Sequence, residues 1–291
     1  MKNKGLYIFL AVAIVLVIGA TAAVLIKNKI KNNSEPESEP RVVVLDVSED
    51  IPGSSEEILP DTSEIPPETS DVPGSGITDS INTYFTNSIF IGDSLVVGYR
   101  EYLARYKDSP VSPATFLAAS SYTAAHALNE EDDLHPLFRG KKQPVWDNIS
   151  ETGAKRVFIM FGTNDLVVED AARASEDVLA LVDKIHEKTP GVEIHIISMT
   201  PVYGDVNKGA LNNPTIDVFN YYLLQGAMEH GAGYLDINTP LKDENGNIRE
   251  EYCSDNYVHE TDKAYEEVWD TLLVQYAKEH FNPEETKAES E

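Results

Sequence analysis

Short apolar segments alternate with longer amphipathic segments between residues 81 and 280. Apolar runs of strand length occur at 88–91, 115–119, 156–161, 193–198 and 233–237. Helical periodicity is clearest over 170–188, and further helices are expected near 96–106, 144–151, 215–229 and 261–278. Strands that alternate with helices predict an α/β fold, in which a parallel sheet is covered by helices on both faces.

Polar residues lie just beyond three of the expected strands. Ser94 follows the first strand, Ser121 the second and Asn164 the third. Because open α/β sheets bind ligands beyond the carboxyl ends of their strands, these three residues are expected close together. The loop over 200–213, after the fourth strand, is expected to shape the same pocket.

The N-terminal region predicts a membrane anchor. Residues 5–26 are 22 consecutive residues without a charge, and a helix of that length spans roughly 33 Å. A cleaved signal peptide is the alternative, since Ala20-Thr21-Ala22 has the small-residue spacing of a cleavage site, although the apolar run continues beyond it. We expect residues 1–31 to be a retained single-pass anchor in the cell membrane, with the catalytic domain extracytoplasmic.

Residues 32–80 have the composition of a disordered linker. They contain seven prolines and 13 Asp or Glu against one basic residue, and such a segment cannot bury a core. This leaves one globular domain over 81–280 and a disordered tail over 281–291. Residues 81–291 carry 17 basic and 36 acidic side chains, a net charge of −19, which argues against nucleic acid as a partner.

Ser94 and His259 have the strongest case for chemistry. A serine hydroxyl is a weak nucleophile until a neighbouring base takes its proton, and His259 is the candidate base. The imidazole in turn needs a partner at its other nitrogen, for which Asp255 is preferred and Asn256 is the alternative. No metal-binding motif is present and Cys253 is the single cysteine, so neither a metal nor another cofactor is expected.

Three segments together resemble the SGNH (GDSL-type) hydrolase family. They are Gly92-Asp93-Ser94, Phe161-Gly162-Thr163-Asn164-Asp165 and Asp255-Asn256-Tyr257-Val258-His259. The resemblance covers residues 84–280 and implies a three-layer flavodoxin-like fold with a five-stranded parallel sheet. It also implies an ester as the substrate and Ser94 as the nucleophile. Gly92, Asp93 and Gly162 are expected to support the site by shaping the turns at the strand ends.

The resemblance implies three donors for the oxyanion that forms when a carbonyl is attacked. They are the backbone N–H of Ser94, the backbone N–H of Ser121 and the side-chain amide of Asn164. The chain departs from the family's pattern in two places. A serine, at 121 or at 120 if the alignment shifts by one, replaces a glycine that can adopt positive φ. The family's aspartate stands three residues before the histidine, where this chain has Asn256, and Asp255 lies one residue earlier.

These features predict a membrane-anchored bacterial serine esterase. Its expected substrate is a short-chain O-acyl ester on cell-envelope carbohydrate, cleaved through an acyl-serine intermediate, and its other expected partner is the membrane. An O-acyltransferase that uses the same site is one alternative. A non-catalytic glycan-binding protein on the same fold is another, supported by Ser121 and by the displaced Asp255.

Overall fold

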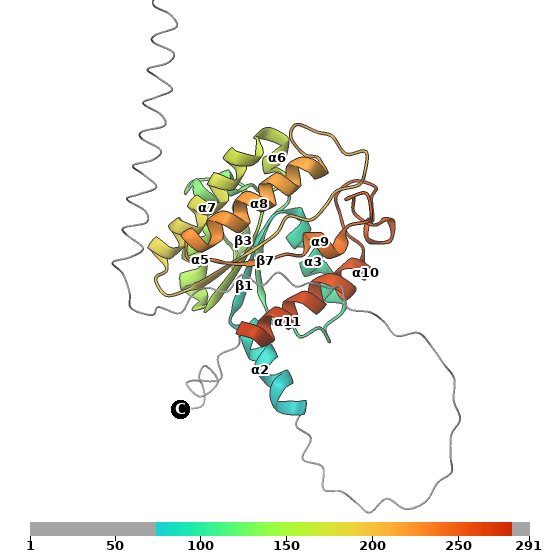
Figure 1. The fold of residues 1–291 in the computed structure, drawn as a ribbon. Helices are drawn as coiled ribbons and strands as arrows, with labels where there is room; N and C mark the ends of the chain where they lie inside the picture. Colours follow the sequence, from blue (N-terminus) through green and yellow to red (C-terminus); the bar gives the residue numbers. More distant parts are fainter. Residues whose placement is uncertain (1–73, 281–291) are drawn as a thin grey trace, which may run out of the picture. The chain divides into compact units, whose positions relative to one another are not determined.

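The five predicted apolar segments form one parallel sheet. The computed structural model describes residues 74–280, and its parallel strands are β1 (Ser88–Gly92), β2 (Thr115–Ala118), β5 (Arg156–Met160), β6 (Glu193–Ile197) and β7 (Gly233–Leu235). They pair in the order β2-β1-β5-β6-β7, and every pairing is parallel (Figure 1). This is the 2-1-3-4-5 order of flavodoxin-like folds. The predicted α/β class and five-stranded parallel sheet are confirmed, with strand ends within two residues of those expected.

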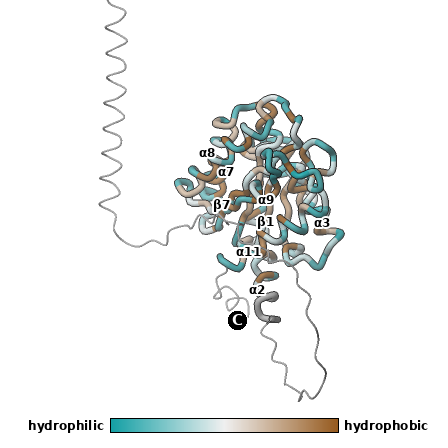
Figure 2. Tube along the Cα trace, turned by 45° about the vertical axis from the view of Figure 1, so that its right-hand side comes forward, coloured by the Kyte–Doolittle hydropathy of each residue, from teal (hydrophilic) through white to brown (hydrophobic). Residues whose placement is uncertain are grey.

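Helices cover both faces of the sheet, as the alternating pattern predicts. One hydrophobic core joins the sheet to α4 (Ala124–Leu128), α5 (Val145–Thr152), α7 (Ala171–Lys188) and α8 (Asn213–Glu229). A second core joins the opposite face to α2 (Gly74–Thr86), α3 (Ser94–Arg105), α9 (Asn238–Leu241), α10 (Asp262–Ala264), the π-helix η2 (Tyr265–Asp270) and α11 (Thr271–His280). Figure 2 shows hydrophobic stretches gathered around β1 and β7 and mostly hydrophilic loops at the periphery.

Smaller elements occupy the connections. They are the antiparallel pair β3 (Leu137–Phe138) and β4 (Lys141–Lys142), the short helix α6 (Asp165–Val168) and the 3-10 helix η1 (Glu250–Tyr252). None of them has the length or periodicity that a sequence pattern can detect.

The domain begins earlier than predicted. The linker was expected to continue to residue 80, but helix α2 begins at Gly74. Its buried residues Ile81, Tyr84 and Phe85 pack in the second core, and this packing stabilises the helix. The predicted anchor, the linker up to residue 73 and the predicted tail lie outside the described residues.

Of the helices within residues 74–280, none is both long and apolar enough to cross a bilayer.

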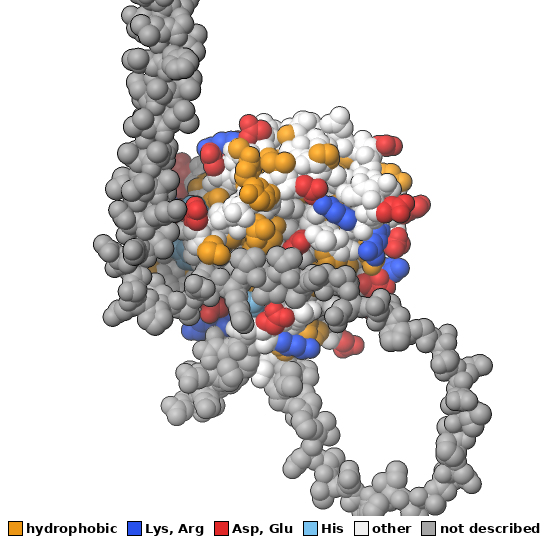
Figure 3. Space-filling view, in the orientation of Figure 1, with side chains coloured by type: hydrophobic (Ala, Val, Ile, Leu, Met, Phe, Trp, Pro, Cys, Tyr) orange, Lys and Arg blue, Asp and Glu red, His pale blue; other side chains and the backbone are white. Residues whose placement is uncertain are grey.

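Helix α8 also presents apolar side chains to solvent. Val218, Tyr221, Tyr222 and Met228 are large exposed hydrophobic residues on this helix. Figure 3 shows hydrophobic side chains on the face where α8 lies, with charged side chains of both signs around them. This explains why the sequence pattern of α8 is less one-sided than that of α7.

Helix α3 packs closely against α10 and η2, which lie near the C-terminal end of the described residues. A Cβ at Gly98 would lie 2.3 Å from the hydroxyl oxygen of Tyr265, so a larger residue has no room there. Tyr99 donates a hydrogen bond of 2.5 Å to Asp270, and Arg105 forms an ion pair with Asp262. These contacts tie the helix that starts at Ser94 to the helices that follow residue 259.

We predict that Gly98→Ala destabilises the protein even though alanine is the better helix former. The clash with the Tyr265 hydroxyl should cost about 1–3 kcal/mol of unfolding free energy, more than the roughly 1 kcal/mol that alanine contributes to a helix. Urea unfolding of the full chain measures the change.

The matched control is Gly98→Ala combined with Tyr265→Phe. This pair removes the clashing oxygen, and the next ring atom lies 3.4 Å away, an ordinary contact. Gly98→Ala should therefore cost less stability when it is introduced into Tyr265→Phe than when it is introduced into the wild type. Strictly additive effects of the two changes would contradict the proposed contact.

Candidate active site

Ser94 lies where β1 passes directly into α3. Asp93 caps the helix by accepting a hydrogen bond of 2.9 Å from the backbone N–H of Leu95. A Cβ at Gly92 would lie 2.4 Å from the carbonyl oxygen of Met160, so this tight strand end requires glycine. As the first residue of α3, Ser94 has a backbone N–H that no intrahelical carbonyl can accept. Its hydroxyl and its N–H therefore both sit at the positive end of a helix.

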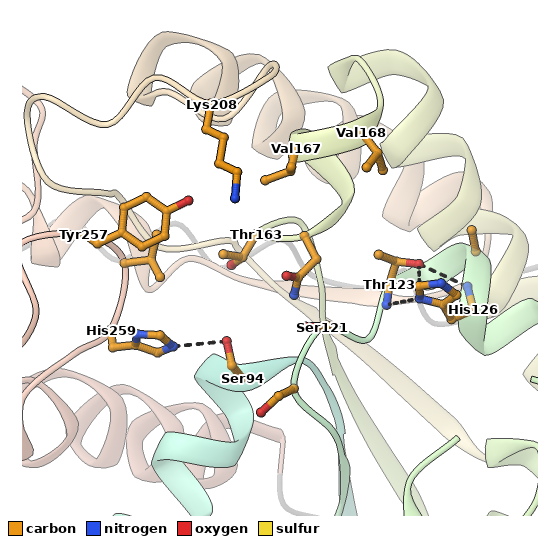
Figure 4. A pocket seen from close by; sticks show the side chains of 14 residues that line it. Ser94, Ser121, Thr123, His126, Thr163, Val167, Val168, Lys208, Tyr257 and His259 are labelled. Carbon is orange, nitrogen blue, oxygen red and sulfur yellow. Dashed lines mark hydrogen bonds between the residues drawn. The ribbon is translucent and has the colours of Figure 1, made fainter. Parts of the chain in front are cut away.

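The imidazole of His259 lies between Ser94 and Asp255. Nε2 of His259 is 3.2 Å from Oγ of Ser94, and Nδ1 is 2.6 Å from Oδ2 of Asp255 (Figure 4). An aspartate at Nδ1 holds the proton on that nitrogen, which leaves Nε2 free to accept the proton of Ser94. The structure thus brings together the three residues that the sequence nominated, and it is Asp255 that contacts the ring.

A compact turn lets Asp255 reach His259 from four residues away. Oδ1 of Asp255 accepts hydrogen bonds from the backbone N–H groups of Tyr257, Val258 and His259, at 2.8, 3.0 and 3.2 Å. Asn256 adopts φ = +54°, a left-handed conformation that asparagine tolerates better than most residues. Asn256 therefore supports the site by forming this turn, while Asp255 faces the ring.

Asp255 is suited to remain ionised. Its partial burial alone would raise its pKa, but the hydrogen bonds from the His259 ring and from the backbone N–H groups of His259 and Tyr257, with the charge of His259, outweigh burial. The pKa of Asp255 therefore lies below its ordinary value. A carboxylate in this position is able to stabilise a positive charge on an imidazole.

Ser121 adopts the conformation that the family's glycine would supply. Its φ is +61°, so its backbone takes up the left-handed region despite the Cβ. Ser120 and Ser121 both line the same pocket as Ser94, but only Ser121 has this conformation among the two. Ser121 therefore adopts the left-handed backbone conformation for which the family's pattern has a glycine, at a cost of order 1 kcal/mol in strain.

Asn164 reaches the pocket from the end of β5. Gly162 before it has φ = +135°, and a Cβ there would lie 2.6 Å from Sδ of Met199. Nδ2 of Asn164 donates a hydrogen bond of 3.3 Å to Asp93. Since an amide nitrogen carries two hydrogens, this bond orients the side chain and leaves one donor for a substrate.

Asp165 joins the two loops that carry Ser121 and Asn164. One oxygen accepts from the backbone N–H of Ala124 at 2.8 Å and the other from that of Gly162 at 3.1 Å. Burial, opposed by these hydrogen bonds and aided by the nearby charge of Asp93, raises the pKa of Asp165 to about 7. Its geometry supports a structural role at the site, and Asp93 has a comparable one.

These residues surround a pocket of about 590 Å³. Besides Ser94, Ser121, Asn164 and His259, its lining includes Thr163, Val167, Val168, Lys208 and Tyr257. The prediction that the loop over 200–213 shapes the pocket is confirmed, since Lys208 belongs to it. The sequence did not distinguish Lys208 from other surface lysines or Tyr257 from packing aromatics, and no local pattern marks either one.

A serine, a histidine and an aspartate in this arrangement, at the carboxyl edge of a parallel sheet, define the class of serine hydrolases. The GDSL-like lipase/acylhydrolase family model matches residues 90–267, more than half of the chain. The chain belongs to this family and is an ester hydrolase.

Known structures and one curated relative add to this picture. The fold is similar to that of an acylhydrolase from Bacteroides fragilis (17% identity, TM-score 0.53, 67% of this chain and 88% of that one). It is also similar to a GDSL-like lipase from Bacteroides thetaiotaomicron (14% identity, TM-score 0.51, 66% and 87%). An N-acylneuraminate cytidylyltransferase from Escherichia coli is 33% identical over 113 residues, which are 38% of this chain and 25% of that protein. The match thus spans a quarter of the curated relative.

We predict that Asp255→Asn lowers kcat/KM for an activated ester by about 10³- to 10⁴-fold. The amide keeps an oxygen for the backbone N–H groups but turns a donor toward Nδ1, which favours the wrong tautomer of His259. The matched control is Asn256→Gly, which preserves the positive φ and should retain most of the activity. A larger loss in Asn256→Gly than in Asp255→Asn would reverse the assignment.

Glu260 lies buried directly beside the site. Its side chain accepts a hydrogen bond of 3.4 Å from the Tyr265 hydroxyl, and only 5% of the residue is exposed. Burial, together with the charge of Asp93, raises the pKa of Glu260 to about 8. The folded protein therefore holds a proton on Glu260 that the unfolded chain releases near the ordinary pKa of 4.5.

This pKa shift predicts a pH-dependent cost to stability. Because the pKa is raised in the folded state, the contribution of Glu260 is fully present below about pH 4.5 and is lost as pH rises through about 8. Relative to Glu260→Gln, the wild type should lose about 4 kcal/mol of unfolding free energy between about pH 5 and pH 9. Urea unfolding across this range, with the exposed Glu251→Gln as control, measures it. A stability difference that does not change with pH would refute the assignment.

Proposed function

We propose that this protein hydrolyses short-chain O-acyl esters of carbohydrates through an acyl-Ser94 intermediate. The observation that carries the proposal is that His259 contacts both Ser94 and Asp255, with Ser94 and His259 lining a pocket of about 590 Å³. A hydroxyl held against Nε2 of a histidine is the arrangement that activates a serine.

The steps follow from the positions of the side chains. His259 takes the Ser94 proton as Oγ attacks the ester carbonyl, and Asp255 stabilises the imidazolium that results. The backbone N–H groups of Ser94 and Ser121 and the amide of Asn164 are the proposed donors to the oxyanion. His259 then gives its proton to the leaving alcohol, and water, activated by the same histidine, releases the acid and regenerates Ser94.

The pocket offers polar groups for a sugar alcohol together with apolar surface for a small acyl group. Of its lining residues, only Ala125, Val167, Val168 and Val258 are aliphatic, and the others offer hydroxyl, amide, imidazole or ammonium groups. A long acyl chain needs a continuous apolar wall to replace its contact with water. A sugar alcohol with a small acyl group matches this lining better. The curated relative carries a carbohydrate in its name, N-acylneuraminate, which is consistent with this substrate class.

We also propose that the enzyme acts at the cell envelope, held by residues 5–26. Support comes from the 22-residue uncharged run and the acidic, proline-containing segment that separates it from the domain. In this arrangement the domain would reach esters near the membrane without binding the lipid itself.

A fluorophosphonate probe and p-nitrophenyl acetate test the proposal on the full chain. The wild type should be labelled and should hydrolyse the ester, whereas Ser94→Ala should lose labelling and at least about 10³-fold in kcat/KM, with a similar loss of hydrolysis in His259→Ala. The control Ser150→Ala removes an exposed serine on α5 and should match the wild type. Hydrolysis that survives in Ser94→Ala would overturn the assignment. Adding a sugar acceptor, and assaying acetylated sugar as well as acetate, separates transfer from hydrolysis.

A further inference from the structure

Lys208 is the basic residue that distinguishes the active-site pocket. Among the described residues that line this pocket it is the one lysine or arginine, and none of them is Asp or Glu. Figure 4 shows its ammonium group pointing into the pocket, between Tyr257 and Val167 and above Thr163. This is a positive group beside the nucleophile in a domain whose residues 81–291 carry a net charge of −19.

The backbone around Lys208 is fixed in place. Lys208 and Leu211 exchange two backbone hydrogen bonds of 3.1 and 3.0 Å, and the N–H of Ala210 donates to the carbonyl of Leu166 at 2.7 Å. Gly209 has φ = +64°, and a Cβ there would lie 2.1 Å from the carbonyl oxygen of Val167. The loop is therefore pressed against α6, the helix that starts immediately after Asn164. Lys208 is thereby held at a set position relative to the proposed oxyanion site.

The charge of Lys208 is not used within the described part of the chain. No ion pair joins its ammonium group to a carboxylate in residues 74–280, whereas Lys141, Lys184, Lys188, Lys242 and Lys263 each have one. A solvent-exposed lysine needs no partner, but this one is aimed at a substrate pocket without acidic groups. An anionic group bound there would meet a positive charge and no nearby carboxylate lining the pocket.

Lys208 and His259 line the same pocket. The alcohol oxygen receives its proton from Nε2 of His259, so the alcohol portion of the ester lies next to that ring. Figure 4 shows Tyr257, two residues from His259, on one side of the Lys208 ammonium group and Val167 on the other. The described lining has no arginine and no second lysine, the groups that a phosphate monoester usually gathers around its near-double charge, so we assign a carboxylate to Lys208.

We propose that Lys208 binds a carboxylate on the alcohol portion of the substrate, so that the enzyme acts on O-acylated sugar acids. The proposal rests on the esterase function proposed above and names its substrate class. Lys208 acts as a specificity residue: it forms an ion pair with the sugar carboxylate and orients the acylated hydroxyl toward Ser94.

The test compares two substrates that differ in one charge. They are methyl glucuronoside O-acetylated on its ring hydroxyls and the corresponding uncharged glucuronamide, and the readout is the acid-to-amide ratio of kcat/KM with the full chain. The wild type should prefer the acid by about fivefold, as expected for a solvent-accessible ion pair. Lys208→Met should bring the ratio close to one, and Lys208→Arg, which keeps the charge, should retain the preference. The preference should also fall at high salt.

Lys278→Met is the matched control, because it removes the same charge from α11, away from the pocket. It should keep the wild-type ratio. A wild-type ratio near one, an unchanged ratio in Lys208→Met, or an equal fall in Lys278→Met would overturn the role of Lys208. If O-acetylated glucose 6-phosphate is hydrolysed with a higher kcat/KM than the O-acetylated glucuronoside, and this difference depends on Lys208, the carboxylate assignment is overturned.

A binding measurement separates this proposal from the esterase function. In Ser94→Ala, the dissociation constants of the same acid and amide should differ by about fivefold, and adding Lys208→Met should abolish the difference. If p-nitrophenyl acetate hydrolysis depends on Ser94 but neither ratio exceeds one, the Lys208 proposal fails alone. If no hydrolysis depends on Ser94 while the binding difference persists and requires Lys208, the esterase proposal fails and the carboxylate site stands.

Discussion

The close approach of α3 to Tyr265 is the constraint on which the site depends. Ser94 begins α3, and His259 precedes the helices that contain Tyr265, so the two residues meet only if these helices pack at one distance. Gly98 permits that distance, and the Tyr99–Asp270 hydrogen bond holds it. Ser94 and His259 are 165 residues apart in sequence, and their contact is thus a consequence of how these helices pack.

The oxyanion side of the pocket follows a different principle. Parallel strands deliver their following loops to one edge of the sheet, so the loops after β1, β2 and β5 meet without further help. Their fine alignment comes from the buried side chains of Asp93 and Asp165, which accept hydrogen bonds from the Asn164 amide and from the backbone N–H of Ala124 on neighbouring loops. Burying such groups costs stability, as the raised pKa of Asp165 indicates, and the site gains rigid donors in return.

Much of the fold and of the candidate site could be predicted because the signals are local. Apolar runs placed all five strands within two residues, and the residues that follow strands nominated Ser94, Ser121 and Asn164. Helix α2 was partly missed, since its start lies in a segment with linker composition and its buried side chains act only against the assembled core. Lys208 could not be chosen from sequence, because a lysine in a pocket and a lysine in solvent have the same local pattern.

The sequence by itself determined the α/β class and the parallel sheet, since periodicity and strand-end position are properties of neighbouring residues, and its motifs nominated Ser94 and His259. Only the tertiary structure decided between Asp255 and Asn256 and showed that Ser121 adopts a positive φ. Both depend on how a loop closes: three backbone N–H groups gather on one oxygen of Asp255 and leave the other for His259. The number of residues between Asp255 and His259 does not set the distance between their side chains, because a turn can bring residues four positions apart within hydrogen-bond distance.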